Sequence, residues 1–118
     1  MKVGIIGSRN FDDYDLLEES ILEIVKLEDI DAIISGGARG ADTLAEKFAV
    51  KHNKIKVIFK PNWIRYRSQA GFLRNTDIVE TSDILIAFWD GKSSGTKDSI
   101  SKAEKRNIPL YIIKTSKS

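Results

Sequence analysis

Short apolar runs rich in Val, Ile and Phe alternate along the chain with segments of helical periodicity. Each run is short enough for one strand, and the runs occupy residues 3–6, 32–34, 55–59, 84–89 and 110–113. Because nearly every position in them is apolar, the runs are typical of strands that are buried on both faces of a sheet. The pattern therefore predicts five strands.

Four intervening segments carry helical signals. The clearest covers residues 40–52, where apolar side chains recur at the i, i+3, i+4 and i+7 spacing of an amphipathic helix. A helix near the start follows Asp12-Asp13 and a last helix ends near residues 107–109, whereas a helix from residue 70 to about 80 is the least regular. The apolar positions that mark the first and last helices are Leu17, Ile21, Ile24, Val25, Ile100 and Ala103.

Strict alternation of strands and helices with short connections predicts a parallel sheet with right-handed crossovers. We expect an α/β, doubly wound, Rossmann-like domain, with a five-stranded, mainly parallel sheet and helices on both faces. The length fits one domain over residues 1–118, and the polar tail 114–118 is expected to fray.

The loops at the two ends of the predicted sheet differ in chemistry. The loops that enter strands are plain, whereas those that leave strands are rich in glycine, hydroxyl and basic residues. Doubly wound sheets bind ligands at the carboxyl ends of their strands, near the switch point. This comparison predicts a phosphate-bearing nucleotide or nucleotide derivative at that edge.

The loop after the second strand is the sharpest signal. Three glycines in five positions allow a tight turn and close approach of the backbone, and the following helix N-terminus favours an anion. Arg39 is expected to contact phosphate, whereas Asp42 either caps the helix or takes a ribose hydroxyl. The alternative is an ordinary strand-to-helix turn. The candidate ligand-binding residues of this loop are Gly36, Gly37, Ala38, Arg39, Gly40 and Asp42.

Two further loops at the same edge offer similar groups. Ser93, Ser94, Gly95 and Thr96 open the last helix, where they either cap it or bind the ligand. Gly7, Ser8 and Arg9 follow the first strand, and Arg9 is either a ligand contact or a partner of Asp12 or Asp13.

Other polar and aromatic residues have two readings each. Arg74 and Asn75 lie in the irregular helix and either serve a polar task or form a solvated face. Trp63, in a loop, either packs or stacks on a base. His52, the single histidine, is expected to be structural, because it continues an apolar stripe at a helix end.

Composition and charge narrow the alternatives. The chain has no cysteine, which excludes disulfides, a Cys-zinc site and thiol catalysis. We expect no metal site, and the sequence identifies no cofactor other than a nucleotide-like ligand. The apolar run at the start is too short for a signal peptide and no stretch could span a membrane, so a cytoplasmic protein is expected. Net charge is only +2, yet residues 47–76 hold eight basic and no acidic residues, whereas residues 1–31 hold nine acidic and three basic ones.

Four segments together resemble the SLOG superfamily, and most closely its small YspA-like branch. The match extends over residues 2–113. The segments are Gly7-Ser8-Arg9-Asn10-Phe11, Ser35-Gly36-Gly37-Ala38-Arg39-Gly40-Ala41-Asp42, Ala70-Gly71-Phe72-Leu73-Arg74-Asn75, and residues 87–96.

The resemblance implies a Rossmann-like fold that recognises nucleotides or their derivatives. The superfamily includes Lonely Guy phosphoribohydrolases, molybdenum-cofactor carriers, Smf/DprA DNA-uptake proteins and sensor domains of anti-phage systems. Arg74 resembles the catalytic arginine of the Lonely Guy enzymes, and Gly95 and Thr96 match their glycine-rich motif. Ser99, however, stands where that motif has its catalytic glutamate.

We therefore expect the protein to bind or sense a nucleotide-derived ligand. The first alternative is an N-glycosidic hydrolase, in which Asp42, Asp90 or Asp98 replaces the missing glutamate and Arg39 and Arg74 hold the phosphate. The second is single-stranded nucleic-acid binding through the basic stretch from Lys47 to Arg74, with Trp63 and Tyr66 available for stacking. A homodimer is also expected, because Lonely Guy relatives are typically dimers and the acid-rich first helix could meet the basic surface of a second copy.

Overall fold

The computed structural model describes residues 1–115, and its strands form one sheet. The strands are β1 (Lys2–Gly7), β2 (Ala32–Ser35), β3 (Ile55–Ile58), β4 (Ile84–Trp89) and β5 (Leu110–Lys114). Their order is β3-β2-β1-β4-β5, and every neighbouring pair is parallel. The doubly wound fold is confirmed, and within the described residues the sheet is parallel throughout.

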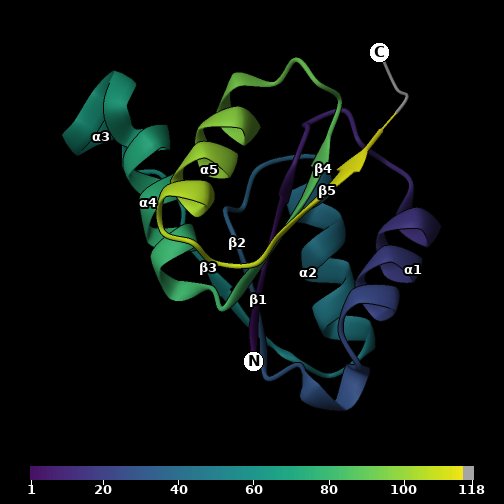
Figure 1. The fold of residues 1–118 in the computed structure, drawn as a ribbon. Helices are drawn as coiled ribbons and strands as arrows, with labels where there is room; N and C mark the ends of the chain where they lie inside the picture. The colour runs from purple at the N-terminus through teal and green to yellow at the C-terminus, as the bar shows by residue number, and fades with distance from the viewer. Residues whose placement is uncertain (116–118) are drawn as a thin grey trace.

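Helices cover both faces of the sheet (Figure 1). α1 (Tyr14–Ile24) and α2 (Ala41–Lys51) lie on one face, and α4 (Ala70–Thr81) and α5 (Ser94–Lys105) lie on the other. No helix within residues 1–115 is long and apolar enough to cross a membrane.

A short helix, α3 (Trp63–Tyr66), occupies the segment that was expected to be a loop. The Asn62 side chain begins it by accepting a hydrogen bond from the Arg65 backbone N–H at 3.1 Å. Short 3-10 turns at Leu27–Asp29 and Arg67–Gln69 complete the connections. The helix projects from the rest of the molecule (Figure 1), so its side chains have few neighbours.

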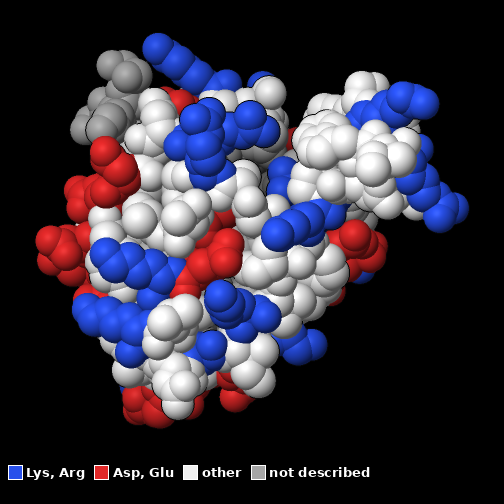
Figure 2. Space-filling view, turned by 180° about the vertical axis from the view of Figure 1, so that it is seen from behind, with Lys and Arg blue, Asp and Glu red and all other residues white. Residues whose placement is uncertain are grey.

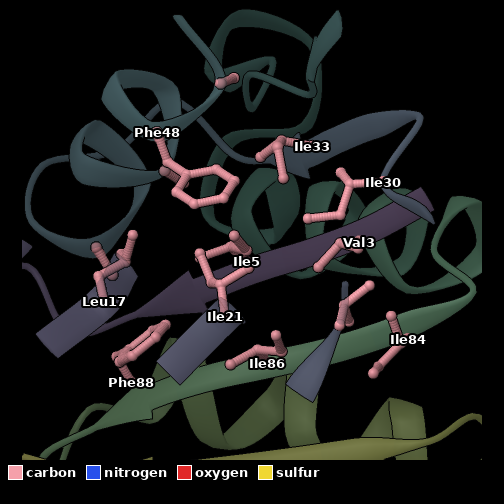
Figure 3. Close-up of a cluster of buried hydrophobic side chains, with 14 of the residues drawn as sticks. Val3, Ile5, Leu17, Ile21, Ile30, Ile33, Phe48, Ile84, Ile86 and Phe88 are labelled. Atoms are coloured by element: carbon pink, nitrogen blue, oxygen red, sulfur yellow. The ribbon is translucent and has the colours of Figure 1, made fainter. Parts of the chain in front are cut away.

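Two apolar layers hold the helices against the sheet. On one side, Phe48 and the α1 side chains Leu17 and Ile21 pack over Ile5 and Ile33 (Figure 3). On the other side, residues of α4 and α5 pack over the strand residues that point to the opposite face of the sheet. This layer includes Ile6, Ile34, Ile78, Val79, Leu85, Ala87, Ile100 and Ala103. Successive strand residues enter opposite layers because side chains alternate across a sheet.

Burial on both faces holds for the central strands but not for the edge strands. β3 and β5 end the sheet, and Ile55, Tyr111 and Ile112 are exposed there, Ile55 to 67%. Lys56 lies on β3, where a lysine opposes pairing with another chain. The order of elements along the chain predicts that residues 55–59 end one half of a doubly wound sheet, and the observed strand order confirms this.

Two residues of the tail that was expected to fray, Lys114 and Thr115, instead have fixed backbone partners. Lys114 pairs with Trp89 in the sheet, and the buried Thr115 donates its backbone N–H to the Trp89 carbonyl at 2.9 Å. The strand continues through these two polar residues because β4 offers them backbone partners. Residues 116–118 lie outside the described part of the chain.

The acidic and basic segments of the chain meet within the fold. α1 packs against α2, where the Glu18 carboxylate lies 2.9 Å from Lys51 Nζ and 2.8 Å from His52 Nε2. The His52 ring also contacts the Phe48 ring, with centroids 4.5 Å apart. His52 therefore has the structural role that the sequence predicts.

Gly40 brings the loop after β2 into backbone contact with the loop after β1. Its φ is +77°, and a Cβ at this position would stand 2.2 Å from the Ser8 carbonyl oxygen. The following residue, Ala41, donates its N–H to that same oxygen at 3.3 Å. Because the obstructing atoms are backbone, they cannot move aside for a side chain.

We expect Glu18→Gln to change how stability depends on pH. Hydrogen bonds from Lys51 and His52 lower the pKa of Glu18 from 4.5 to about 2. A lowered carboxyl pKa contributes stability above the unfolded value, and this contribution is lost as pH falls through the folded value. In urea titrations the free energy of unfolding of the wild type should exceed that of Glu18→Gln at neutral pH. This difference should disappear as the pH falls from 4.5 to about 2. Glu19→Gln, an exposed change on the same helix, is the control, and an equal gap in that variant would contradict the assignment.

Substitution by alanine should lower the free energy of unfolding at Gly40 but not at Gly95. Gly40→Ala should destabilise by about 1–3 kcal/mol, because both the positive φ and the backbone contact oppose a side chain. Gly95 has open space around its Cβ position and lies in α5, so Gly95→Ala should be neutral or stabilise by less than about 1 kcal/mol. Chemical denaturation measures both, and a stable Gly40→Ala would show that the two loops separate easily.

Candidate functional site

A cavity of about 580 Å³ opens at the carboxyl ends of β1 and β4. The loops after these strands, the start of α2 and the facing sides of α4 and α5 form its wall. The predicted ligand-binding residues that line it are Gly7, Ser8, Arg9, Ala38, Asp42, Trp63, Arg74, Asn75, Ser93, Ser94, Gly95 and Thr96.

A second cavity of about 460 Å³ adjoins the first. It adds Gly36, Gly37 and Arg39 from the loop after β2, together with Lys60 and Pro61 from the end of β3. The two cavities are neighbours because four residues line both, namely Arg9, Ala38, Trp63 and Arg74. Of the predicted ligand-binding residues, Gly40 alone lines neither cavity, since its role is the backbone crossing described above.

The N-terminus of α5 is built by its own loop and still leaves donors available. Asp90 Oδ1 accepts hydrogen bonds from the Ser93 and Lys92 N–H groups, which lower the pKa of Asp90. Ser93 is the N-cap, and its Oγ accepts from the Thr96 N–H at 3.5 Å. The N–H groups of Ser94 and Gly95 have no acceptor within the helix, because a first helical turn has none. The same residues, Ser93 to Thr96, therefore cap α5 and line the larger cavity.

Ser8 ties the loops after β1 and β4 together. It is buried, its Oγ accepts from the Asp90 N–H at 3.1 Å, and its N–H donates to the Phe88 carbonyl at 2.9 Å. Its carbonyl oxygen also accepts from Ala41 at the start of α2. Ser8 thus lines the larger cavity and holds together the loops after β1 and β4 and the start of α2.

Arg74 and Asn75 link three parts of the site. Arg74 Nη1 donates to the Gly36 carbonyl at 2.7 Å, and its Nε donates to Asn75 Oδ1 at 2.9 Å. Asn75 Nδ2 in turn donates to the Gly95 carbonyl at 3.2 Å. The polar segment of α4 is therefore a bridge between the loop after β2 and the start of α5, and not a solvated face.

Asp42 lies beneath the same loop and is only 5% exposed. Its Oδ2 accepts from the Ala38 N–H at 3.1 Å, so it braces the loop rather than capping α2. Burial raises the pKa of Asp42, and the Ala38 hydrogen bond and the Arg74 charge oppose that rise. A Cβ on Gly36 would stand 2.5 Å from Arg74 Nη1 and 3.0 Å from Asp42 Oδ2, so a side chain there would displace the Arg74 guanidinium.

The three candidate carboxylates occupy different places. Asp42 and Asp90 line the larger cavity, and both accept backbone hydrogen bonds of their own loops. Asp98 lines neither cavity; its Oδ2 lies 2.7 Å from Lys102 Nζ and 3.1 Å from Asn75 Nδ2, between α4 and α5. Among residues 1–115 no cluster of three or more His, Cys, Asp or Glu side chains could hold a metal ion.

Several lining residues were not singled out from the sequence. Lys60 and Pro61 follow β3 after Phe59, so their position after a strand was the available signal, and Asn10 lies within a resemblance segment beside Arg9. Phe72 lies within the resemblance segment on α4. Trp63 is 52% exposed and packs over Gly71, whose Cβ position is 3.6 Å from the indole ring.

Solved structures with this fold include two DNA processing proteins. The first, DNA processing protein A from Streptococcus pneumoniae, has a TM-score of 0.76 and 18% identity, covering 97% of this chain and 50% of that one. The second, from Helicobacter pylori, is a structure that describes a single-stranded DNA binding mode, with a TM-score of 0.71 and 22% identity, covering 95% and 64%. This chain thus spans about half to two thirds of their length, and at these identities the likeness is one of fold.

Sequence comparison identifies relatives of similar size. The Gene 61 protein of Mycobacterium phage D29 is 29% identical over 116 residues, which cover 92% of this chain and 93% of the phage protein. The model of the YspA, cpYpsA-related SLOG family matches residues 1–66, which include the loops after β1 and β2. The resemblance stated from the sequence is confirmed, and the chain belongs to the YspA, cpYpsA-related SLOG family.

Proposed function

We propose that this protein binds a nucleotide or nucleotide-derived phosphate ligand at the carboxyl edge of its sheet. The observation that carries the proposal is the larger cavity, in which the free N–H groups of Ser94 and Gly95 share one wall with Arg9 and Arg74. Backbone donors at a helix N-terminus and guanidinium groups are both groups that bind phosphate.

The rest of the larger cavity suits a nucleoside. Its volume of about 580 Å³ lies within the ordinary range for small-molecule sites. Trp63 offers an aromatic face for a base, and the cavity wall offers hydroxyl and amide groups for a sugar, among them Asn10, Ser68 and Ser99. These groups support a nucleotide over a simple phosphate ion.

Binding or sensing is favoured over hydrolysis by the state of the two carboxylates in this cavity. Release of a base needs a carboxylate that is free to stabilise positive charge and activate water. Asp42 is buried and bonded to Ala38, and Asp90 holds the turn that begins α5. Both side chains support the loops that would contact the ligand.

The proposal predicts that nucleoside monophosphates bind and that Arg9→Gln weakens them by about tenfold, since it removes one charge-assisted hydrogen bond. Isothermal titration measures the affinities, and chromatography of the same mixtures measures any free base. Arg9 is exposed, so the variant should fold. Arg106→Gln, which alters a guanidinium paired with Glu80, is the control. No heat with any nucleotide in a broad panel would refute the proposal.

A homodimer remains part of the proposal, with its interface on α3 and α4 rather than on α1. Glu18 already pairs within the protomer, which removes one charge expected to face a second copy. Large apolar side chains that do not line the larger cavity are exposed on and beside α3; they are Ile64, which is 92% exposed, Tyr66 and Leu73. A second copy would cover this apolar surface.

Single-stranded DNA binding is the second candidate, and α3 also motivates it. Trp63 and Tyr66 are exposed, and Arg65 and Arg67 flank them, which is the combination of stacking and charge that single strands need. Figure 2 shows this projecting part with Lys and Arg side chains at its surface. The Helicobacter pylori protein with this fold, which binds single-stranded DNA, supports the same candidate.

Two variants separate these uses of α3. Ile64→Glu should convert a dimer to a monomer in light scattering, and because the proposed interface is apolar, salt should leave the wild-type dimer intact.

Arg65→Gln combined with Arg67→Gln should keep the dimer but weaken retardation of single-stranded DNA at low salt. A monomeric wild type at every salt concentration would refute the dimer, and absence of retardation at low salt would refute DNA binding.

A further inference from the structure

The smaller cavity has a charge pattern that differs from that of the larger one. Four cationic side chains line it, and no acidic residue does; the four are Arg9, Arg39, Lys60 and Arg74. The larger cavity includes Asp42 and Asp90. A wall made of cations without carboxylates is a site for an anion.

The fold itself brings these cations together. Arg9, Arg39 and Lys60 each follow a strand, and the order β3-β2-β1 places the ends of those strands side by side. Arg74 reaches the same place from α4, where its guanidinium donates to the Gly36 carbonyl. Charges that are separated in the sequence thus share one cavity of about 460 Å³.

Gly37 contributes to the position of Lys60. Its φ is +71°, and its Cβ position would lie 3.2 Å from Lys60 Cγ and 3.0 Å from the Ile58 side chain. The lysine stem therefore packs directly over the glycine backbone. A larger residue at Gly37 would displace this stem.

The cations also act on one another. Burial lowers the pKa of Arg74, and the nearby charge of Arg9 adds to that effect, whereas Asp42 opposes it. Asp42 faces only Arg74 and does not line the smaller cavity, so the like charges that converge there gain stability from a bound anion.

We propose that the smaller cavity is a second anion subsite, and that the ligand is a nucleotide bearing more than one phosphate. This inference rests on the proposed function: the nucleoside occupies the larger cavity and the second phosphate occupies the smaller one. Arg9, Arg74 and Trp63 line both cavities, so the ligand crosses between them at these residues. Lys60, which lines only the smaller cavity, serves the second phosphate alone.

Isothermal titration with AMP, ADP and diadenosine diphosphate tests the subsite. Wild-type protein should bind ADP about tenfold more tightly than AMP, because a second phosphate adds charge-assisted contacts. Lys60→Gln should remove most of this gain and leave the affinity for AMP within about twofold of wild type. Lys105→Gln, an exposed change in the last turn of α5, is the charge-matched control and should change neither affinity.

The outcomes distinguish this inference from the function on which it rests. AMP binding without any gain for ADP would overturn the second subsite and leave nucleotide binding in place. A gain that survives both Lys60→Gln and Arg39→Gln would place the second phosphate elsewhere and also overturn the subsite. Absence of binding by every ligand would overturn both proposals. Where the gain is present, equal affinity for diadenosine diphosphate would show that the subsite accepts a phosphate within a linkage, and preference for ADP would show that it needs a terminal phosphate.

Discussion

β1 pairs with β2 on one side and with β4 on the other, and the candidate site depends on this central pairing. The chain leaves β1 toward α1 on one face of the sheet, whereas β4 leads to α5 on the opposite face. Loops that diverge in this way leave a crevice at the carboxyl ends of the two strands. Ser8 spans that crevice through its contacts with Phe88 and Asp90, so strand pairing and loop geometry support each other.

Arg74 is the residue that joins the loops on the other side of the site. A guanidinium that is partly buried needs its donors satisfied, and the Gly36 carbonyl and Asn75 satisfy two of them. Asp42 lies close by and lowers the electrostatic cost of that burial. The site is therefore preorganised: the loop after β2, α4 and α5 are connected by hydrogen bonds between protein groups alone.

The family and the neighbouring folds agree with the architecture but leave the ligand to local chemistry. Proteins with this fold carry different functions, because function depends on the side chains grafted on the loops. Here the loops give one cavity with mixed polar groups and an adjoining cavity whose charged side chains are all cationic. That division argues for a ligand with two chemically different ends.

The sequence by itself determined the five strands, four of the helices and the edge at which the polar loops meet, because hydrophobic periodicity and glycine-rich turns are local signals. α3 escaped notice because a four-residue helix has too few positions to show a period. Only the tertiary structure decided that β5 is the second exposed edge, that Asp98 pairs with Lys102 away from the cavities, and that Lys60 joins Arg9, Arg39 and Arg74. These facts depend on strand order and on contacts between distant segments, and one basic residue among eight in residues 47–76 has no local feature that reveals its neighbours.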